Sequence, residues 1–426
     1  MKKNILFIYI LLSFATRSVF AQNNADTLYL STQEAEKIFL QNNLSLLAAK
    51  YNIDANKALV RQAKLWDNPV LNTDQNIYDK EGGFFSHNQT TGTFFIQVQQ
   101  LIRTAGKRDK AAQLALDNTT ISQAQLDDLL RTLRYILHND LLEVNHLLKI
   151  KKVYTREINE LEKLIKGMDL QLQIGNVSLK DNLRIKALLF GLQNELVNAD
   201  AQLIPLQSEI KLLLNNNEPK FIAPLFQYKF SDLTTAILPT TDTLQSLASI
   251  NRPDARIAAT ALDFQKHNLI YQKALAKPDV TVGTEFDQRS SYAPNYFGLA
   301  VSLPLNIFNK NQGNIAAAKF NINQQQALTT QTGAKIKNDV TTAVTKFSFY
   351  QSVNNRQQLE FSNQYDTLFT NVLQSYEQRK IGLLEFIDFI DAYKDTKLKM
   401  IEQHNGLLHA TEEVNYSVGS DIIKLN

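Results

Sequence analysis

The side chains that most often carry chemistry in proteins are few in this sequence and widely scattered. There is no Cys, which excludes disulfides, cysteine-ligated zinc and thiol catalysis. The closest two of the six His residues, His404 and His409, point roughly 140° apart around a helix, so they cannot share a metal from one face. The other four are His87, His138, His146 and His267. We therefore expect no resident metal and no cofactor.

No catalytic motif is present either, because the sequence lacks a Gly-x-Ser-x-Gly elbow, a phosphate-binding loop and a His-Glu-x-x-His motif. One acidic pair stands out, Glu385 and Asp388, since residues three apart on a helix share one face. Repeated around an axis, such a pair would form a carboxylate ring that favours cations. Alternatively, both are solvated helix charges, with Glu385 paired to Arg379 or Lys380. We do not expect an enzyme.

The first 21 residues have the composition of an export signal. Lys2 and Lys3 precede an apolar run over residues 5–12, and small residues lead to a cleavage point after Ala21. Cleavage would leave 42 basic against 42 acidic side chains. A neutral mature chain argues against nucleic acid as a partner. No later stretch reaches the roughly 18 apolar residues of a membrane-spanning helix, so we expect an exported protein without a helical anchor.

The mature sequence gives the same order of elements twice: helix, two strands, very long helix, tip turn and return helix. We expect a first repeat over residues 22–214, an equatorial segment over 215–243, a second repeat over 244–417 and a tail over 418–426. The strand pairs are predicted at about 69–79 with 92–101 and about 279–287 with 296–304, and the tip turns near 175 and 380.

The predicted helices are unusually long. Ser31 and Glu34 stand at capping-box spacing and open a helix that runs to about residue 65. Residues 104–172 lack Pro, and ~70 helical residues would span roughly 100 Å. The remaining helices are expected at 177–214, 253–275, 314–378 and 383–416. A fibrous coiled coil would need strict heptads, whereas the apolar spacing here wanders, which favours helices packed side by side as the staves of a cylinder.

The predicted strands suit lipid on one face. Phe94, Ile96 and Val98 share one face, with Phe95, Gln97 and Gln99 on the other, and strands of about nine residues fit a tilted membrane span. A pair of soluble hairpins is the alternative. Four strands cannot close a membrane barrel, which needs about eight, and lipid does not tolerate an open sheet edge. If these strands enter a membrane, copies of the chain must pool them, and three copies would supply twelve.

Several segments of the sequence match one known family. They are residues 35–63 with Asn42-Asn43, Gln99-Gln100-Leu101 before Gly106-Lys107-Arg108, Asn251-Arg252-Pro253-Asp254, residues 302–315, and residues 376–388. In these segments the chain resembles the TolC-like outer membrane efflux proteins. Residues 302–315 are most similar to the outer-membrane components of heavy-metal (cobalt–zinc–cadmium or copper) resistance–nodulation–division (RND) pumps.

The resemblance implies a mainly α fold with membrane β-structure: a homotrimer with a twelve-stranded transmembrane β-barrel, four strands per chain, above a long α-helical barrel. It implies a location in the outer membrane of a Gram-negative bacterium, in contact with its lipids. The partners would be a periplasmic adaptor (membrane fusion) protein and an inner-membrane RND transporter, and the channel would be a passive exit duct for heavy-metal cations. Two alternatives remain, a duct for drugs, organic compounds or secreted peptides, and a periplasmic coiled-coil scaffold without a pore.

The resemblance also implies site residues at the periplasmic tip. Glu385 and Asp388 match an acidic pair that lines the closed gate, and Tyr376 matches a tyrosine that helps to hold it shut. The family commonly has Gly three residues after this tyrosine, where this chain has Arg379. This departure leaves the turn geometry open, with Gly382 as a candidate for the left-handed position.

The companion turn near residue 175 is marked by Gly175, Asn176 and Asp181. Several relatives are lipoproteins, which the absence of Cys rules out for this sequence.

Overall fold

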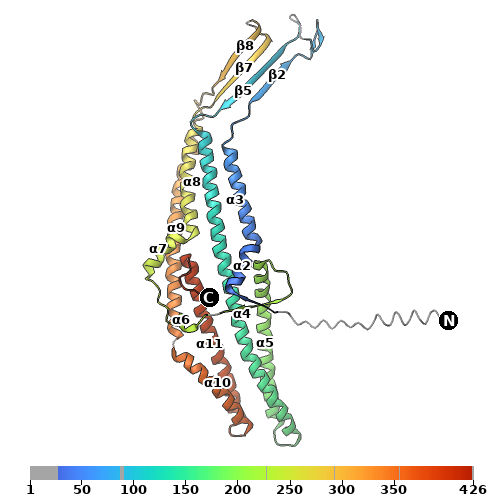
Figure 1. Cartoon of the computed structure of the whole chain (residues 1–426), viewed down its shortest axis with the longest axis vertical. Helices are drawn as coiled ribbons and strands as arrows, with labels where there is room; N and C mark the ends of the chain where they lie inside the picture. Colours follow the sequence, from blue (N-terminus) through green and yellow to red (C-terminus); the bar gives the residue numbers. More distant parts are fainter. Residues whose placement is uncertain (1–26, 87–90, 227, 292, 355, 425–426) are drawn as a thin grey trace, which may run out of the picture.

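The computed structural model describes residues 27–86, 91–226, 228–291, 293–354 and 356–424. The expected export signal over residues 1–21 lies outside them. The molecule is long and narrow, with a four-stranded sheet at one end and two helical hairpin turns at the other (Figure 1). Within the described residues, no helix is both long enough and apolar enough to cross a membrane.

The first helical segment is two helices, α2 (Thr32–Asn42) and α3 (Leu44–Ala63). The capping box that opens α2 is present as predicted. The Ser31 hydroxyl accepts the backbone N–H of Glu34, and the Glu34 carboxylate accepts the backbone N–H of Ser31.

The prediction of one unbroken helix over residues 31–65 is wrong, because the chain bends at Asn43. Its ψ of 120° is extended, and its side-chain oxygen accepts the backbone N–H of Leu46 and so caps α3. Its side-chain amide donates to the carbonyl oxygen of Leu213 at 2.9 Å. A buried polar side chain is thus fully used at the bend, which offsets the lost helical hydrogen bonds.

Four strands form one antiparallel sheet in the order β2-β5-β7-β8. Their bounds are Val70–Gln75 for β2, Phe94–Ile102 for β5, Val280–Arg289 for β7 and Pro294–Ser302 for β8. The strands are rich in β-branched and aromatic residues, which favour this conformation. Strands from both halves of the chain therefore meet at the β5–β7 pair.

The strand expected at 69–79 is shorter than predicted. It ends at Gln75, and the next residues enter a small separate hairpin of β3 (Tyr78–Asp79) and β4 (Gly83–Phe84). Asp79 fixes this hairpin because its carboxylate accepts the backbone N–H groups of Glu81 and Gly82. Such local hydrogen bonds by an Asp side chain compete with a continuing strand.

The first long helix is continuous, and the second is not. α4 (Lys107–Gln173) has 67 residues and is followed by α5 (Leu179–Leu214). The segment predicted as one helix over 314–378 is instead α9 (Gln312–Val353) and α10 (Arg356–Glu377), followed by α11 (Leu383–Val418).

The break after α9 is made by Asn354, which is buried. Its side-chain amide donates to the carbonyl oxygens of Tyr350, at 2.7 Å, and of Gln403 on α11, at 3.0 Å. The first bond satisfies the end of α9, and the second ties the break to the neighbouring helix. The correction to the predicted helix therefore has a side-chain cause.

The equatorial region joins the two halves. β1 (Thr27–Ser31) pairs in parallel with β6 (Phe221–Leu225), so the start of the described chain is held beside residues that follow α5. A short helix α6 (Phe230–Thr234) follows, then α7 (Thr241–Asn251) and α8 (Pro253–Leu275).

The core is divided into three clusters along the length of the molecule, because no point of so narrow a shape is far from the surface. One lies among α2, α4, α5 and β6, a second among α7, α9 and α11, and a third toward the tip among α4, α5, α10 and α11. Each cluster binds neighbouring helices to one another. Many large apolar side chains remain exposed on the single chain, which is typical of a protein that makes further contacts.

Candidate functional site

The sheet has one apolar face. The pairing register places Leu71 beside Val98, Val98 beside Thr284, and Thr284 beside Leu299. Directly paired residues of an antiparallel sheet project to the same side. The apolar residues on this side are Leu71, Phe94, Ile96, Val98, Ile102, Val280, Val282, Phe286, Phe297, Leu299 and Val301. This face includes the three β5 side chains that the sequence places together.

The opposite face also carries Phe95 and Leu101, but it is mainly polar and is internally hydrogen-bonded. The Gln97 amide donates to the Glu285 carboxylate at 2.7 Å, and its carbonyl oxygen accepts the amides of Gln99 at 2.6 Å and Asn72 at 3.3 Å. These groups come from β2, β5 and β7, so they form a ladder across the sheet. Such a face suits contact with water, while the apolar face suits lipid or another apolar surface.

At the other end of the molecule, two turns of the same geometry join α4 to α5 and α10 to α11. In the first, Gly175 has a φ of 79°, and the backbone N–H of Asn176 donates to the carbonyl oxygen of Gln171. In the second, Arg379 has a φ of 58°, and the N–H of Lys380 donates to Ser375. Both are helix C-termini closed by a left-handed residue.

Arg379 itself therefore occupies the left-handed position, and Gly382 does not. Gly382 has a φ of −79° and stands at the N-terminus of α11, where no side chain caps the helix. The left-handed position of this turn is thus held by a non-glycine residue, for which this conformation is strained.

The structure brings several of the predicted tip residues together. The Tyr376 ring stacks on that of Phe386, with ring centres 4.5 Å apart, and burial and the negative charge of Asp181 raise the pKa of Tyr376. The Gln171 side-chain oxygen accepts the Asn176 amide at 2.9 Å and lies 3.5 Å from the Arg379 guanidinium. The two turns are therefore in contact through side chains from both hairpins.

Glu385 and Asp388 lie on the exposed side of α11, while Phe386 and Ile387 between them are buried. Among the residues that the structure describes, neither carboxylate forms an ion pair, so the expected alternative pairing of Glu385 with the cations of the tip turn is not observed. The pair is free to face solvent or a neighbouring molecule.

Farther from the tip lies a polar cluster with more ion pairs than the tip turns, and it was not predicted from the sequence. The Asp366 carboxylate on α10 accepts the Tyr393 hydroxyl at 2.5 Å and pairs with Lys397 at 2.8 Å and Arg156 at 3.3 Å. Burial raises the pKa of Asp366, but the hydrogen bonds from Lys397 and Tyr393 outweigh it and leave the pKa lowered. The cluster joins α4, α10 and α11. Tyr393 and Lys397 are four apart on one helical face, which was the only local signal.

Glu157 on α4 was also missed, although it is fully buried. Neither of its carboxylate oxygens has a hydrogen-bond partner among the described residues. Burial raises its pKa to about 8, against the attraction of Lys394 and with the repulsion of Glu195 and Asp391. At neutral pH this side chain is therefore mostly protonated.

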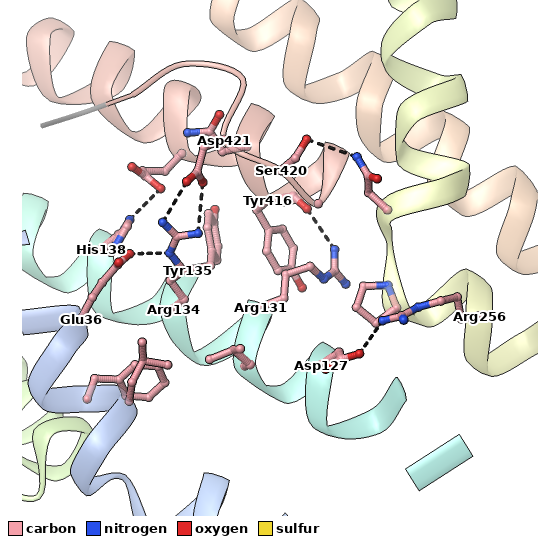
Figure 2. A pocket seen from close by; sticks show the side chains of 18 residues that line it. Glu36, Asp127, Arg131, Arg134, Tyr135, His138, Arg256, Tyr416, Ser420 and Asp421 are labelled. Atoms are coloured by element: carbon pink, nitrogen blue, oxygen red, sulfur yellow. Dashed lines mark hydrogen bonds and ion pairs between the residues drawn. The ribbon is translucent and has the colours of Figure 1, made fainter. Parts of the chain in front are cut away.

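A third polar cluster lies at the equator and lines a cavity of about 500 Å³ (Figure 2). His138 on α4 contacts Glu36 of α2 at 2.6 Å and Glu412 of α11 at 3.0 Å. Burial lowers the pKa of His138, but the two carboxylates outweigh it and raise the pKa to about 9. Arg134 extends the cluster, since it pairs with Glu36 and, at 3.0 Å, with Asp421 of the C-terminal segment.

The remaining described His residues take part in separate helix contacts. His267 pairs with Asp117 at 2.6 Å, His409 contacts Asn139 on α4, and the His404 ring lies tilted against that of Phe230. His146 lies half-buried on α4, and His87 lies outside the described residues. The described part of the chain holds no group of three or more His, Asp or Glu side chains placed to bind a metal ion.

Comparison with known proteins agrees with this architecture. A family model described as "Outer membrane efflux protein" matches residues 37–216. No curated protein matches the sequence.

Solved structures share the fold over nearly the whole chain. A membrane protein from Pseudomonas aeruginosa has a TM-score of 0.74 and 14% identity, with 91% of this chain and 93% of that chain covered. CusC has a TM-score of 0.72 and 14% identity, with 94% and 96% covered. The CmeC outer membrane channel of Campylobacter jejuni has a TM-score of 0.73 and 11% identity, with 92% and 86% covered. At these identities the likeness shows the fold. By the family model, residues 37–216 are similar to the outer membrane efflux proteins.

Proposed function

We propose that this chain is the outer-membrane channel subunit of a tripartite RND-type efflux pump. The observation that carries the proposal is the sheet, apolar on one face and polar on the other, at the end of a 67-residue helix. In this proposal three copies join their sheets edge to edge, β8 of one chain beside β2 of the next, into a twelve-stranded transmembrane barrel. Edge pairing would satisfy the backbone groups that lipid cannot.

Below the barrel, the helices of three chains would form a passive tunnel through the periplasm. The partners would be a periplasmic adaptor and a proton-driven inner-membrane transporter, as the family resemblance implies. The clusters around Asp366 and His138 support a rigid wall, because each joins helices from both halves of the chain. We propose no catalytic role for any residue. A periplasmic scaffold without a pore would not explain why the sheet has one exposed apolar face and one polar face.

The test is the assembly and conductance of the purified mature protein. We expect heat-resistant trimers in the outer membrane and discrete channels in planar bilayers. Leu299→Lys, on the apolar face, should abolish trimers in the membrane, since a cation facing lipid costs about 2–4 kcal/mol near the midplane. Ala300→Lys is the matched control on the polar face, and it should insert normally. A water-soluble monomer without detergent would contradict the proposal.

We further propose that Glu385 and Asp388 line the periplasmic end of the tunnel. Six carboxylates around one axis would favour cations over anions. Both are exposed and unpaired among the described residues, which supports this role. Glu385→Gln with Asp388→Asn should reduce cation selectivity and block by divalent cations. Lys163 and Glu160 pair on the surface of α4, so Glu160→Gln is a control away from the tip turns. Unchanged selectivity in the double variant would contradict the role.

For the cargo we propose heavy-metal cations, because residues 302–315 resemble the metal-pump branch. A duct for organic compounds is the alternative, since the shared fold alone does not distinguish between cargoes. A deletion strain that becomes sensitive to divalent or monovalent metal salts, with unchanged drug sensitivity, would support the first. The reverse pattern would support the second.

A further inference from the structure

The apolar alternation of β8 continues beyond the end of the strand. β8 ends at Ser302, yet every second residue from 297 to 307 is apolar and exposed, by 48 to 74%. These residues are Phe297, Leu299, Val301, Leu303, Leu305 and Ile307. Phe308 follows and is 90% exposed. The apolar face of the sheet thus extends into the neck between the sheet and the helices, which we define as residues 303–310 together with residues 64–67 and 103–108.

This exposure is imposed by the fold of the segment. The Asn306 amide donates to the carbonyl oxygen of Ala276 at 2.8 Å, and the Asn311 amide donates to that of Gln272 at 2.8 Å. Asn311 also adopts a left-handed conformation, with a φ of 58°, at the start of α9. The segment is therefore pinned to the end of α8 at two points, and its apolar side chains are held outward.

Across the neck, cations stand beside these apolar groups. Lys277 and Lys310 are exposed next to the pinned segment. On the side of α3, the Arg108 guanidinium lies 4.0 Å from the ring centre of Trp66, which is 63% exposed. Arg103 is exposed below β5 and pairs with Asp67. Trp, Lys and Arg beside apolar residues are the composition of a membrane–water interface, where the rings enter the lipid and the cations reach phosphates.

We propose that the neck docks on the headgroup layer of the membrane that holds the sheet, with a preference for anionic phospholipid. Phe308, Ile307 and Trp66 would lie among the upper acyl carbons, while Lys277 and Lys310 would contact lipid phosphates. The inference rests on the proposed function, because it needs the sheet to be in a bilayer. Lipid is a better occupant than a sister subunit, since lysines such as Lys277 and Lys310 are depleted from protein interfaces and the apolar surface is continuous with the apolar face of the sheet.

The first test uses Trp66, the sole tryptophan of the sequence, as a depth reporter. The mature protein is reconstituted in phosphatidylcholine vesicles with one-quarter phosphatidylglycerol, carrying a nitroxide either on the headgroup or deep in the acyl chain. We expect the headgroup label to quench Trp66 at least twofold more than the deep label. Quenching by aqueous iodide alone would overturn the inference.

A companion variant separates this inference from the proposed function. In a Trp66→Phe background, Leu299→Trp places the reporter on the apolar face of the sheet, where the deep label should quench it. Suppose that the deep label quenches the Leu299→Trp variant, while neither label nor iodide quenches Trp66 in the unchanged protein. Protein then covers the neck, and only the inference about the neck fails. If the deep label does not quench Leu299→Trp, the sheet is outside the bilayer and both fail.

The second test compares two phenylalanines in the same Trp66→Phe background. Phe308→Trp lies in the neck, and Phe320→Trp is a matched control farther along α9, also exposed. The headgroup label should quench the first at least twofold more than the second. With labelled phosphatidylglycerol, Lys277→Gln with Lys310→Gln should lower the quenching of Phe308→Trp about twofold, whereas Lys380→Gln at the tip should not. Equal quenching of the two reporters, or no effect of the double change, would overturn the inference.

Discussion

The two hairpins that reach the tip, α4 with α5 and α10 with α11, have similar shapes but different local support. The first has Gly175 in its left-handed position and Ser178 as the cap of α5, where the hydroxyl accepts a backbone N–H. The second has Arg379 and Gly382 in the corresponding places, and neither suits its position as well. The first hairpin also continues one unbroken helix, whereas the second begins after the break at Asn354.

The second hairpin is instead held by contacts with the rest of the chain. Asp366 gathers three partners from α4 and α11, and the Tyr376 ring stacks on Phe386. Its conformation therefore depends on tertiary contacts that can be removed one at a time. The same turn is therefore stabilised by local residues in the first hairpin and by contacts with other helices in the second. We expect the second hairpin to unfold locally more readily than the first.

The largest expected effect is on the pH dependence of folding stability. Glu157 lies between the two hairpins, and its pKa rises from 4.5 to about 8 in the folded chain because it is buried. The folded state binds this proton more tightly, so the contribution of Glu157 to stability is greatest below pH 4.5 and is lost as pH rises toward about 8. The slope is at most about 1.4 kcal/mol per pH unit. Glu157→Gln should reduce the slope in this window without abolishing it, because burial also raises the pKa of Asp140 to about 7; urea unfolding of the mature protein followed by circular dichroism measures the change.

A second buried group, His138 at the equator, contributes to stability in a different pH window from Glu157 near the tip. The pKa of His138 rises from 6.5 to about 9, so its contribution is complete below pH 6.5 and is lost as pH rises to about 9. His138→Gln should flatten the curve only in this higher window. If Glu157→Gln leaves the slope between pH 4.5 and 6.5 unchanged, Glu157 is not the titrating group.

The next effect tests whether tertiary contacts hold the second hairpin. Asp366→Asn should destabilise α10 and α11 by about 1–2 kcal/mol, because it leaves Arg156 and Lys397 without their carboxylate; partial exposure keeps the loss below that of a fully buried pair. Hydrogen exchange of α10 and α11 should accelerate accordingly. Asp169→Asn is the matched change in the first hairpin, where an exposed Asp169 pairs with Lys186, and it should have little effect. Equal acceleration in both hairpins would contradict the comparison.

These differences show how far the sequence could predict the structure. The Ser31 cap, the alternating strands and the Gly175 turn depend on residues a few positions apart, and the sequence indicated each one. The break at Asn43 depends on Leu213, 170 residues away, and the break at Asn354 on Gln403, 49 residues away. Local patterns contain no information about such partners, so both helices were predicted as continuous.

The residues of the candidate site also divide into those that local spacing reveals and those that depend on distant partners. Glu385 and Asp388 were found because their spacing places them on one face. The partners of Asp366 come from two other helices, α4 and α11, and nothing near it in sequence distinguishes it from a solvated acid. Tertiary contact also explains why Arg379 can take the place of a glycine.

A smaller effect is expected from the left-handed residue of each turn. Arg379→Gly should stabilise the second hairpin by about 0.5–1 kcal/mol, because glycine adopts this conformation without a side-chain clash. Gly175→Ala should destabilise the first by about 1 kcal/mol, even though the added carbon would meet no atom within 4 Å. Hydrogen exchange at the two turns measures both. A loss of stability in Arg379→Gly would mean that its contact with Gln171 outweighs the backbone strain.

The smallest expected effect concerns the helix caps that follow the turns. Gly382→Ser should add a hydroxyl that accepts a backbone N–H of α11, and there is room for it because no atom lies within 4 Å of the added carbon. The gain should be a few tenths of a kcal/mol, and Ser178→Gly should cost the first hairpin a similar amount. Combined with Arg379→Gly, Gly382→Ser gives the second hairpin both local features of the first. Hydrogen exchange of the two tips should then converge; if α10 and α11 still exchange faster, the break at Asn354 is the main source of the difference.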